Sequence, residues 1–157
     1  MITGQISVGE YVTAHQVHRR RVAFVMNMVM ALVFVTGALV FMAVSKKWGM
    51  IITLCGIGGL IGEFSQNRIA MPARLRRLYA QTKGRVDVAY SWDAEKLFLA
   101  SEHGEAARPW SDFTKAREDN DVILLYHNDA LFEIVSKRWF GNQAQLDEFR
   151  RHLKLVK

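Results

Sequence analysis

The side chains in this 157-residue chain that could do chemistry are five histidines, its carboxylates and a single cysteine. A helical zinc site pairs histidines at i and i+4, and no two histidines here have that spacing. His15 and His18 are three residues apart and could share a helix face, but beside an arginine run this arrangement is more typical of a solvated pair. The remaining histidines, at 103, 127 and 152, are scattered. We therefore expect no metal site and no cofactor.

Other catalytic and binding motifs are missing from the sequence. It contains no G-x-S-x-G elbow, no Walker loop and no dinucleotide fingerprint. The acidic run at residues 118–121 lacks the residue order of a calcium loop, so it predicts a hairpin tip. Cys55 stands alone, which excludes a disulfide framework. We expect a protein that is not an enzyme, because an enzyme on membrane substrates would need clustered titratable groups in a polar pocket.

The formal net charge of +6 is unevenly distributed. Residues 1–85 hold 11 Lys or Arg against two acids, whereas residues 86–157 hold 10 against 13 acids. A nucleic-acid-binding domain concentrates cations on its folded surface. Here the excess cations instead flank the most apolar part of the chain, where membrane topology places them. We therefore expect no nucleic-acid binding.

That apolar part predicts a transmembrane helical hairpin. Residues 22–45 carry no charge over 24 positions, and such a helix covers about 36 Å, enough to cross a hydrocarbon core of about 30 Å. The run is too long for a signal-peptide core, and no small-residue cleavage pattern follows it. The second segment, at about residues 48–67, includes Glu63 roughly one turn inside the boundary, where a carboxyl group can snorkel. We expect both segments to cross.

Cations set the expected orientation of the hairpin. Three arginines precede the first segment and six Lys or Arg follow the second, whereas Lys46 and Lys47 alone lie in the connection. Cytoplasmic flanks carry the excess of Lys and Arg. We therefore expect a multi-pass protein with both termini in the cytoplasm.

Small residues predict how the two helices pack. Four of them share one face of the second segment: Cys55, Gly58, Gly59 and Gly62. The spacing from Gly58 to Gly62 is a GxxxG motif, which permits close approach of helix backbones. We expect this face to pack inside the hairpin against Gly37 and Ala38 or Ala31, with a homo-oligomer interface as the alternative.

The position of the turn sets the expected helix register. A turn centred between residues 46 and 47 would place Asn27 opposite Gln66 and Met30 opposite Glu63. Polar side chains in a membrane helix find partners on the neighbouring helix. We therefore predict a hydrogen bond from Asn27 to Gln66 or Glu63.

Helical segments are expected on both sides of the hairpin. Ser7 and Glu10 have the spacing of a capping box, which predicts a helix from about Val8. A short strand could precede it, over residues 2–6. After the hairpin, Pro72 suits a first helical turn. Residues 68–84 then predict an amphipathic helix with a cluster of basic residues facing anionic lipid: Arg74, Arg76, Arg77 and Lys83. A stop-transfer flank without lipid specificity is the alternative.

From residue 85 onward, short β-type runs alternate with turn signals. The expected strands are residues 86–92, 96–101, 106–113, 122–126 and 131–135. This spacing predicts an antiparallel sheet of four or five strands with one buried face. Asn142 is a candidate N-cap for a closing helix, whose apolar stripe consists of Leu146, Phe149, Leu153 and Val156. The module is therefore α+β, an antiparallel sheet capped by a C-terminal helix.

Several motifs follow one another in the second half of the chain. Trp110-Ser111-Asp112-Phe113 has the form W-[ST]-x-[FIL], and the strand at 131–135 leads into Ser-Lys-Arg-Trp-Phe at 136–140. After a two-helix hairpin, this order resembles the YcxB-like bacterial membrane proteins over nearly the whole chain. Ser136 and Trp139 depart from the Pro and the small residue common in relatives. The resemblance implies a bacterial inner-membrane location and a pleckstrin-homology-like C-terminal domain, and it implies no catalytic residues.

The expected domain order is an N-terminal segment (1–21), the transmembrane hairpin (22–67), the juxtamembrane basic helix (68–84) and a cytoplasmic domain (85–157). The expected function is a non-enzymatic, membrane-anchored adaptor whose module binds a protein segment or a lipid headgroup. The candidate partner groove consists of Trp110, Phe113 and Trp139. The alternative is an oligomeric transporter or channel subunit that uses the glycine face, with Glu63 lining an aqueous path.

Overall fold

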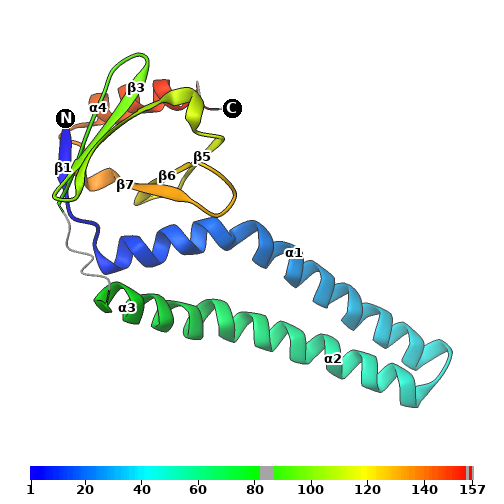
Figure 1. Cartoon of the computed structure of the whole chain (residues 1–157). Helices are drawn as coiled ribbons and strands as arrows, with labels where there is room; N and C mark the ends of the chain where they lie inside the picture. Colours follow the sequence, from blue (N-terminus) through cyan, green and yellow to red (C-terminus); the bar gives the residue numbers. More distant parts are fainter. Residues whose placement is uncertain (82–86, 155, 157) are drawn as a thin grey trace. The chain divides into compact units, whose positions relative to one another are not determined.

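The computed structural model of the chain describes residues 1–81, 87–154 and 156 (Figure 1). Their contacts divide the chain into two compact units. The sheet unit consists of Met1–Val17 and Arg76–Lys157, and the hairpin unit consists of His18–Leu75. The N-terminal segment up to Val17 therefore belongs to the same unit as the C-terminal module.

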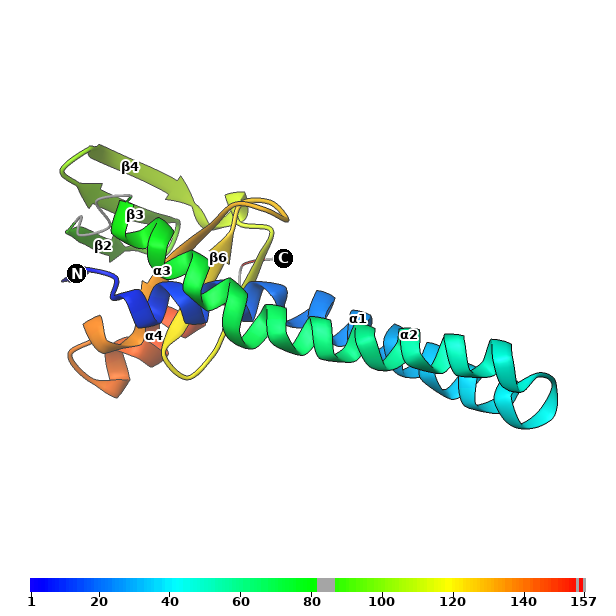
Figure 2. The same cartoon turned by 90° about the horizontal axis from the view of Figure 1, so that it is seen from below.

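Two long helices form the hairpin unit. Helix α1 (Val8–Ala43) has 36 residues and contributes to both units, and helix α2 (Lys46–Ser65) runs antiparallel beside it (Figures 1 and 2). The predicted N-terminal helix and first apolar span are thus one helix. No proline lies between Val8 and Ala43, so nothing removes a backbone donor or breaks the helix.

The second helix continues past the apolar span through a widened turn. A π-helical turn (Gln66–Ala70) joins α2 to helix α3 (Met71–Gln81). The Met71 N–H bonds to the Gln66 carbonyl, five residues back, and Pro72 follows in the first turn of α3, as predicted. Proline cannot donate to the carbonyl four residues earlier and its ring crowds that carbonyl, so a wider turn before it lets the helix continue.

Four antiparallel strands form the first sheet, in the order β1-β2-β3-β4. They are β1 (Ile2–Gly4), β2 (Val88–Trp92), β3 (Lys96–Ser101) and β4 (Gly104–Pro109). The N-terminal strand pairs with β2, with Ile2 opposite Tyr90 and Tyr90 opposite Leu99. Because strand side chains alternate between faces, Ile2, Tyr90 and Leu97 enter the core while Phe98 lies on the outer face.

Three further strands form a second sheet, in the order β5-β6-β7. They are β5 (Lys115–Glu118), β6 (Val122–Tyr126) and β7 (Phe132–Ser136). The prediction of a single sheet was wrong. A 3-10 turn (Trp110–Asp112) interrupts the strand expected over residues 106–113, and the chain resumes in another sheet. The strand β5 was missed because its sequence, Lys-Ala-Arg-Glu, has too few apolar residues.

All five residues of β6 are buried, so the predicted single buried face was also wrong. Its two faces enter different cores. Ile123 and Leu125 join the core between the sheets, whereas the other three residues pack against α1 residues Ala14 and Val17. The first turns of α1 therefore cover the outer face of the second sheet.

The closing helix α4 (Gln143–Leu153) caps the core between the sheets. It begins as predicted, because the Gln145 N–H donates to Asn142 Oδ1 at 2.9 Å. Its Leu146 and Phe149 are buried in that core, and Leu153 and Val156 pack against it. The predicted α+β arrangement of antiparallel strands and a C-terminal helix is confirmed.

Candidate functional site

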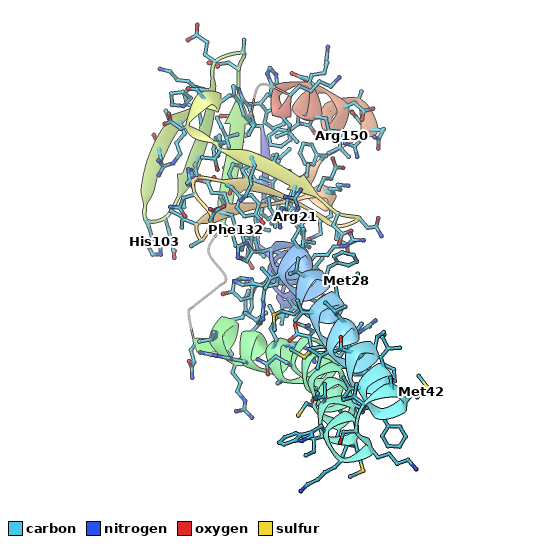
Figure 3. All side chains as sticks on the ribbon, turned by 90° about the vertical axis from the view of Figure 1, so that its right-hand side faces the viewer. Arg21, Met28, Met42, His103, Phe132 and Arg150 are labelled. Carbon is cyan, nitrogen blue, oxygen red and sulfur yellow. The ribbon has the colours of Figure 1, made fainter. Side chains whose placement is uncertain are left out.

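The surface of the hairpin unit is apolar and exposed. Both long helices contain a stretch long and apolar enough to span a membrane, and 6% and 11% of those stretches are buried. Side chains such as Leu32 and Met42 are 66% and 74% exposed. Figure 3 labels two methionines of this surface, Met28 and Met42, at separate places along α1. A core helix of a soluble protein buries such residues, so this surface is suited to contact lipid.

Glycines on both helices make the close contacts inside the hairpin. A methyl group on Gly49 would lie 2.1 Å from the backbone nitrogen of Phe41, and one on Gly37 would lie 2.4 Å from that of Thr53. Further along, a methyl group on Gly56 would lie 2.7 Å from the Phe34 backbone. No side chain fits at these distances, so the two backbones touch because these residues are glycine.

The glycine face predicted from the sequence is different from this one. Of its glycines, Gly59 contacts the Met30 side chain, whereas a methyl group on Gly58 or Gly62 would meet nothing within 4 Å. Cys55 is also exposed. The predicted packing of Gly58 and Gly62 inside the hairpin is therefore wrong, and their GxxxG spacing lies on the open surface of the unit.

The register prediction failed because the turn lies earlier than expected. Lys46 and Lys47 begin α2, and the connection consists of Val44 and Ser45. Met30 consequently faces Gly59 and not Glu63. The residue of α2 that faces Met30 is therefore four positions earlier than predicted, which is about one helical turn.

The predicted hydrogen bond of Asn27 is not formed. Asn27 is exposed, and among the described residues no hydrogen bond joins it to Gln66 or Glu63. Glu63 instead accepts from the side-chain amide of Asn67, one turn later on its own helix, at 2.7 Å. A local i, i+4 pair therefore satisfies one carboxylate oxygen of Glu63 without the other helix.

Three members of the predicted basic cluster lie exposed on α3: Arg74, Arg76 and Arg77. Lys83 lies outside the described residues. The apolar side of α3 includes Leu75, which is buried, and Tyr79, whose hydroxyl donates to the Ile6 carbonyl at 2.5 Å. The predicted division of this helix into a basic and an apolar side is present, and Tyr79 fixes its end to the N-terminal segment.

The residues of the predicted partner groove lie mainly in the core. Trp110 and Phe113 are 2% and 1% exposed. The Trp110 ring packs against Phe149 of α4, and its Nε1 donates to the Asp93 carbonyl at 3.1 Å. Trp139 is half-buried and stacks on Tyr90. The prediction of an open groove here was wrong, because α4 fills the space beside Trp110.

A buried carboxylate fixes the start of α1. The capping box forms as predicted, since the Ser7 N–H donates to Glu10 Oε2 at 2.7 Å and the Glu10 N–H donates to Ser7 Oγ at 3.2 Å. The same carboxylate accepts from Arg138 Nε at 2.7 Å and from the buried Ser136 hydroxyl. Burial raises the pKa of Glu10, but these hydrogen bonds outweigh it and lower the pKa below its ordinary value. Glu10 therefore stays ionised and joins α1 to the end of β7.

Another cluster of titratable side chains, not predicted from the sequence, connects β4 to β7. Glu133 Oε1 is 2.9 Å from His127 Nε2 and 3.6 Å from Arg108 Nε. Its other oxygen is buried and has no hydrogen-bond partner among the described residues. Glu133 shares a face of β7 with the core residue Val135. An acidic residue at an inward position of an alternating strand was the sequence signal that could have indicated this cluster.

The comparisons with known proteins bear on the C-terminal module. Residues 92–153 match the sequence profile of the family described as YcxB-like protein. Over these residues the chain is similar to the YcxB-like family. The YcxB-like region runs from the last residue of β2 to the last residue of α4, so the hairpin and β1 lie outside the match. No curated protein and no solved structure matches the chain.

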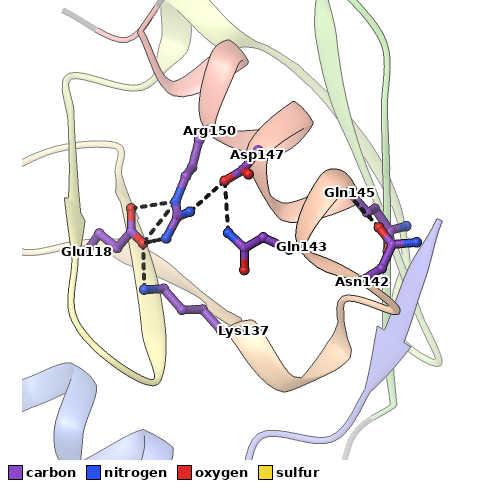
Figure 4. Close-up of polar contacts among 7 residues, drawn as sticks. All are labelled: Glu118, Lys137, Asn142, Gln143, Gln145, Asp147 and Arg150. Atoms are coloured by element: carbon purple, nitrogen blue, oxygen red, sulfur yellow. Dashed lines mark hydrogen bonds and ion pairs between the residues drawn. The ribbon is translucent and has the colours of Figure 1, made fainter.

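Within the YcxB-like region, an ion-pair network attaches α4 to the second sheet (Figure 4). Glu118 accepts from Arg150 Nη2 at 2.5 Å and pairs with Lys137 Nζ at 2.5 Å. Asp147 accepts from Arg150 Nη1 at 2.7 Å and from Gln143 at 2.9 Å. Burial raises the pKa of Glu118, but Arg150 and Lys137 outweigh it and lower the pKa below its ordinary value. This network supports the position of α4.

A Glu118→Gln chain is expected to lose about 1 kcal/mol of stability at neutral pH, a modest value because water screens these partly exposed groups. Since folding lowers the pKa of Glu118, its contribution is present above the ordinary carboxyl range and is lost as the pH falls through the lowered value. The variant should therefore lose less stability than the wild type as the pH falls below the ordinary carboxyl range. Denaturant unfolding followed by tryptophan fluorescence measures this, with the exposed Glu105→Gln as control. Parallel pH curves for wild type and Glu118→Gln would contradict it.

No group of three or more histidine, cysteine or acidic side chains that could hold a metal occurs among the residues that the structure describes. His15 Nδ1 lies 2.9 Å from the Tyr11 carbonyl, which accounts for one of its ring nitrogens.

The turn at residues 118–121 joins β5 to β6, as predicted, with the Asp119 N–H bonded to the Val122 carbonyl.

Proposed function

We propose that this chain is a non-enzymatic adaptor anchored in the bacterial inner membrane by its hairpin, with both termini in the cytoplasm. The observation that carries the proposal is the contrast between the two units. The sheet unit has two closed cores of its own, whereas the hairpin unit exposes side chains such as Phe24 and Ile61. An apolar surface of that length is stable in hydrocarbon and costly in water.

We propose that the sheet unit is a pleckstrin-homology-like fold. In support, the seven antiparallel strands among the described residues are divided into sheets of four and three, and α4 caps the core between them. In this chain the hairpin is inserted between the first and second strands. A small sheet domain of this kind offers surfaces for a protein segment or a lipid headgroup, and tethering raises the local concentration for weak contacts.

Trp110 and Phe113 are in the core, so they cannot form the partner surface. We place that surface on the outside of the first sheet instead. A hollow of about 480 Å³ lies over β2, β3 and β4 there. Small side chains such as Ala89, Ala100 and Ala107 line it, together with Phe98, which is 38% exposed. We propose that a segment of another protein contacts this hollow.

Cysteine accessibility tests the anchoring and its orientation. In a Cys55→Ser background, Lys47→Cys at the hairpin tip is expected to react with a membrane-impermeant maleimide in intact spheroplasts. Glu105→Cys, exposed on β4, is expected to react only after permeabilisation. In the wild-type chain, which keeps Cys55, this thiol should stay unreactive until detergent is added, because it lies in the apolar span. Labelling of Glu105→Cys without permeabilisation would refute the orientation, and recovery of the chain in the soluble fraction would refute the anchoring.

A second candidate function, an oligomeric transporter or channel subunit, is favoured by one observation. Gly58 and Gly62 face open space on α2 and are free to contact another helix. The adaptor proposal expects a monomer in mild detergent. A mass corresponding to several chains, reduced to one chain by Gly62→Leu, would favour the subunit.

A further inference from the structure

Two arginines and two apolar residues form a groove on α1 where the apolar span begins. Arg20, Arg21, Phe24 and Val25 line a space of about 430 Å³. Arg20 and Phe24 are one turn apart, as are Arg21 and Val25, so each arginine stands beside an apolar side chain. Both arginines are exposed, as are Phe24 at 65% and Val25 at 57%. Figure 3 labels Arg21 at this end of the span.

The hairpin unit offers these arginines almost no counter-charge. Residues 18–75 contain seven Lys or Arg and one acid, Glu63. That carboxylate already accepts from Asn67. Arg19 differs from its neighbours because its guanidinium contacts the Met71 sulfur at 3.6 Å, within the hairpin. Arg20 and Arg21 are therefore the two cations of the arginine run that line the groove.

If the hairpin is anchored as proposed, the groove on α1 lies at the edge of the hydrocarbon layer. Residues 22–45 carry no charge, and the arginines immediately precede them. Arginine side chains at such a boundary extend toward the headgroup region while their stems stay along apolar surface. The guanidinium groups consequently reach the height of lipid phosphates, and Phe24 and Val25 stay at the height of the first acyl carbons.

We propose that this groove binds one anionic diacyl phospholipid from the cytoplasmic leaflet. The planar guanidinium groups of Arg20 and Arg21 hold the phosphodiester through paired N–H···O bonds, and an acyl chain lies along Phe24 and Val25. This inference rests on the proposed membrane anchoring and adds a specific lipid class to it. It lies on α1 and is therefore a different site from the basic side of α3.

The chemistry of the groove favours this occupant over others. A zwitterionic lipid brings an ammonium group close to two cations, and a soluble phosphate leaves the apolar half of the groove in contact with water. A second copy of the hairpin would bring more cations and a single acid. An anionic lipid satisfies both halves of the groove.

The test uses the full chain reconstituted in vesicles of phosphatidylcholine and phosphatidylglycerol in equal amounts, then extracted in mild detergent and examined by native mass spectrometry. The wild type is expected to retain phosphatidylglycerol in preference to phosphatidylcholine. The double variant Arg20→Gln, Arg21→Gln should lower this retention about 30-fold. Each basic residue near an anionic surface contributes about 1 kcal/mol, and 1.4 kcal/mol corresponds to a factor of ten in binding. The matched control, Lys46→Gln with Lys47→Gln, removes two cations at the other end of the helices and should retain the lipid.

The inference is overturned by unchanged retention in the double arginine variant or by equal loss in the double lysine control. Displacement of the lipid by excess glycerol phosphate, which has the headgroup without acyl chains, would also overturn it. Failure of the anchoring itself is recognised separately. If the wild-type chain leaves the vesicles on alkaline washing, the membrane proposal fails, whereas a chain that stays but shows no lipid preference refutes the lipid site alone.

Discussion

A Gly49→Leu chain is expected to lose the packing of its hairpin. A β-carbon at Gly49 would lie 2.1 Å from the nitrogen and 2.2 Å from the Cα of Phe41. These are backbone atoms of a continuous helix, so no rotamer change relieves the overlap and the two helices must separate. Overpacking at a tight site costs about 3 kcal/mol. Thermal unfolding of the chain in detergent or nanodiscs, followed by helical circular dichroism, should show the loss.

Gly58→Leu is the matched control for this prediction. It introduces the same side chain into the same helix, and a methyl group there would meet nothing within 4 Å. Both variants gain the same helix propensity over glycine, about 1 kcal/mol, so their difference isolates the contact between the helices. Equal stability of the two variants would contradict the assigned packing face.

The hairpin illustrates what the sequence could and could not predict. Length, lack of charge and flanking cations were sufficient for two long apolar helices. The packing face was not, because α2 has glycines at 49, 56, 58, 59 and 62, which point in several directions. Moving the turn from residues 46–47 to Val44 and Ser45 changes which of them face α1. Helix caps at a two-residue turn give too weak a sequence signal to settle that choice.

In the sheet unit, local signals predicted local structure and missed the tertiary arrangement. The capping box at Ser7 and the N-cap at Asn142 each depend on residues three apart, and both formed. Trp110 was assigned to a groove because an aromatic residue near a turn suits either a surface or a core. Its burial depends on Phe149 of α4, nearly forty residues later in the chain, and on the second sheet that the missed strand β5 begins.

The ion pairs across the fold were beyond the sequence for the same reason. Glu133 pairs with Arg108, and Glu10 pairs with Arg138, but no spacing rule relates such distant residues. The alternation of β7 is a signal that Glu133 points inward, but it does not identify the partner. A lone inward charge on a strand is therefore a useful sign of an ion pair whose other member must come from the structure.

A Glu10→Ala chain is expected to show the largest loss of stability among substitutions of charged residues in the sheet unit. The Glu10 side chain is 9% exposed, and it accepts from Arg138, from the Ser7 N–H and from the fully buried Ser136 hydroxyl. Removing the carboxylate leaves these donors without their acceptor. Hydrogen bonds to charged groups contribute about 1.5–3 kcal/mol each. Because Arg138 is 57% exposed and water can replace part of its contact, we expect a total loss of about 3 kcal/mol.

Denaturant unfolding of the full chain in detergent, followed by the fluorescence of the tryptophans in the sheet unit, measures this loss. Glu148→Ala, an exposed glutamate of α4, is the control and should change stability by less than about 0.5 kcal/mol. Since folding lowers the pKa of Glu10, its contribution is present above the ordinary value of 4.5 and disappears as the pH falls through the lowered value. The wild type and Glu10→Ala should therefore converge in acid, and a difference that persists at low pH would mean that packing of the side chain, and not its charge, fixes the first turn of α1 to the end of β7.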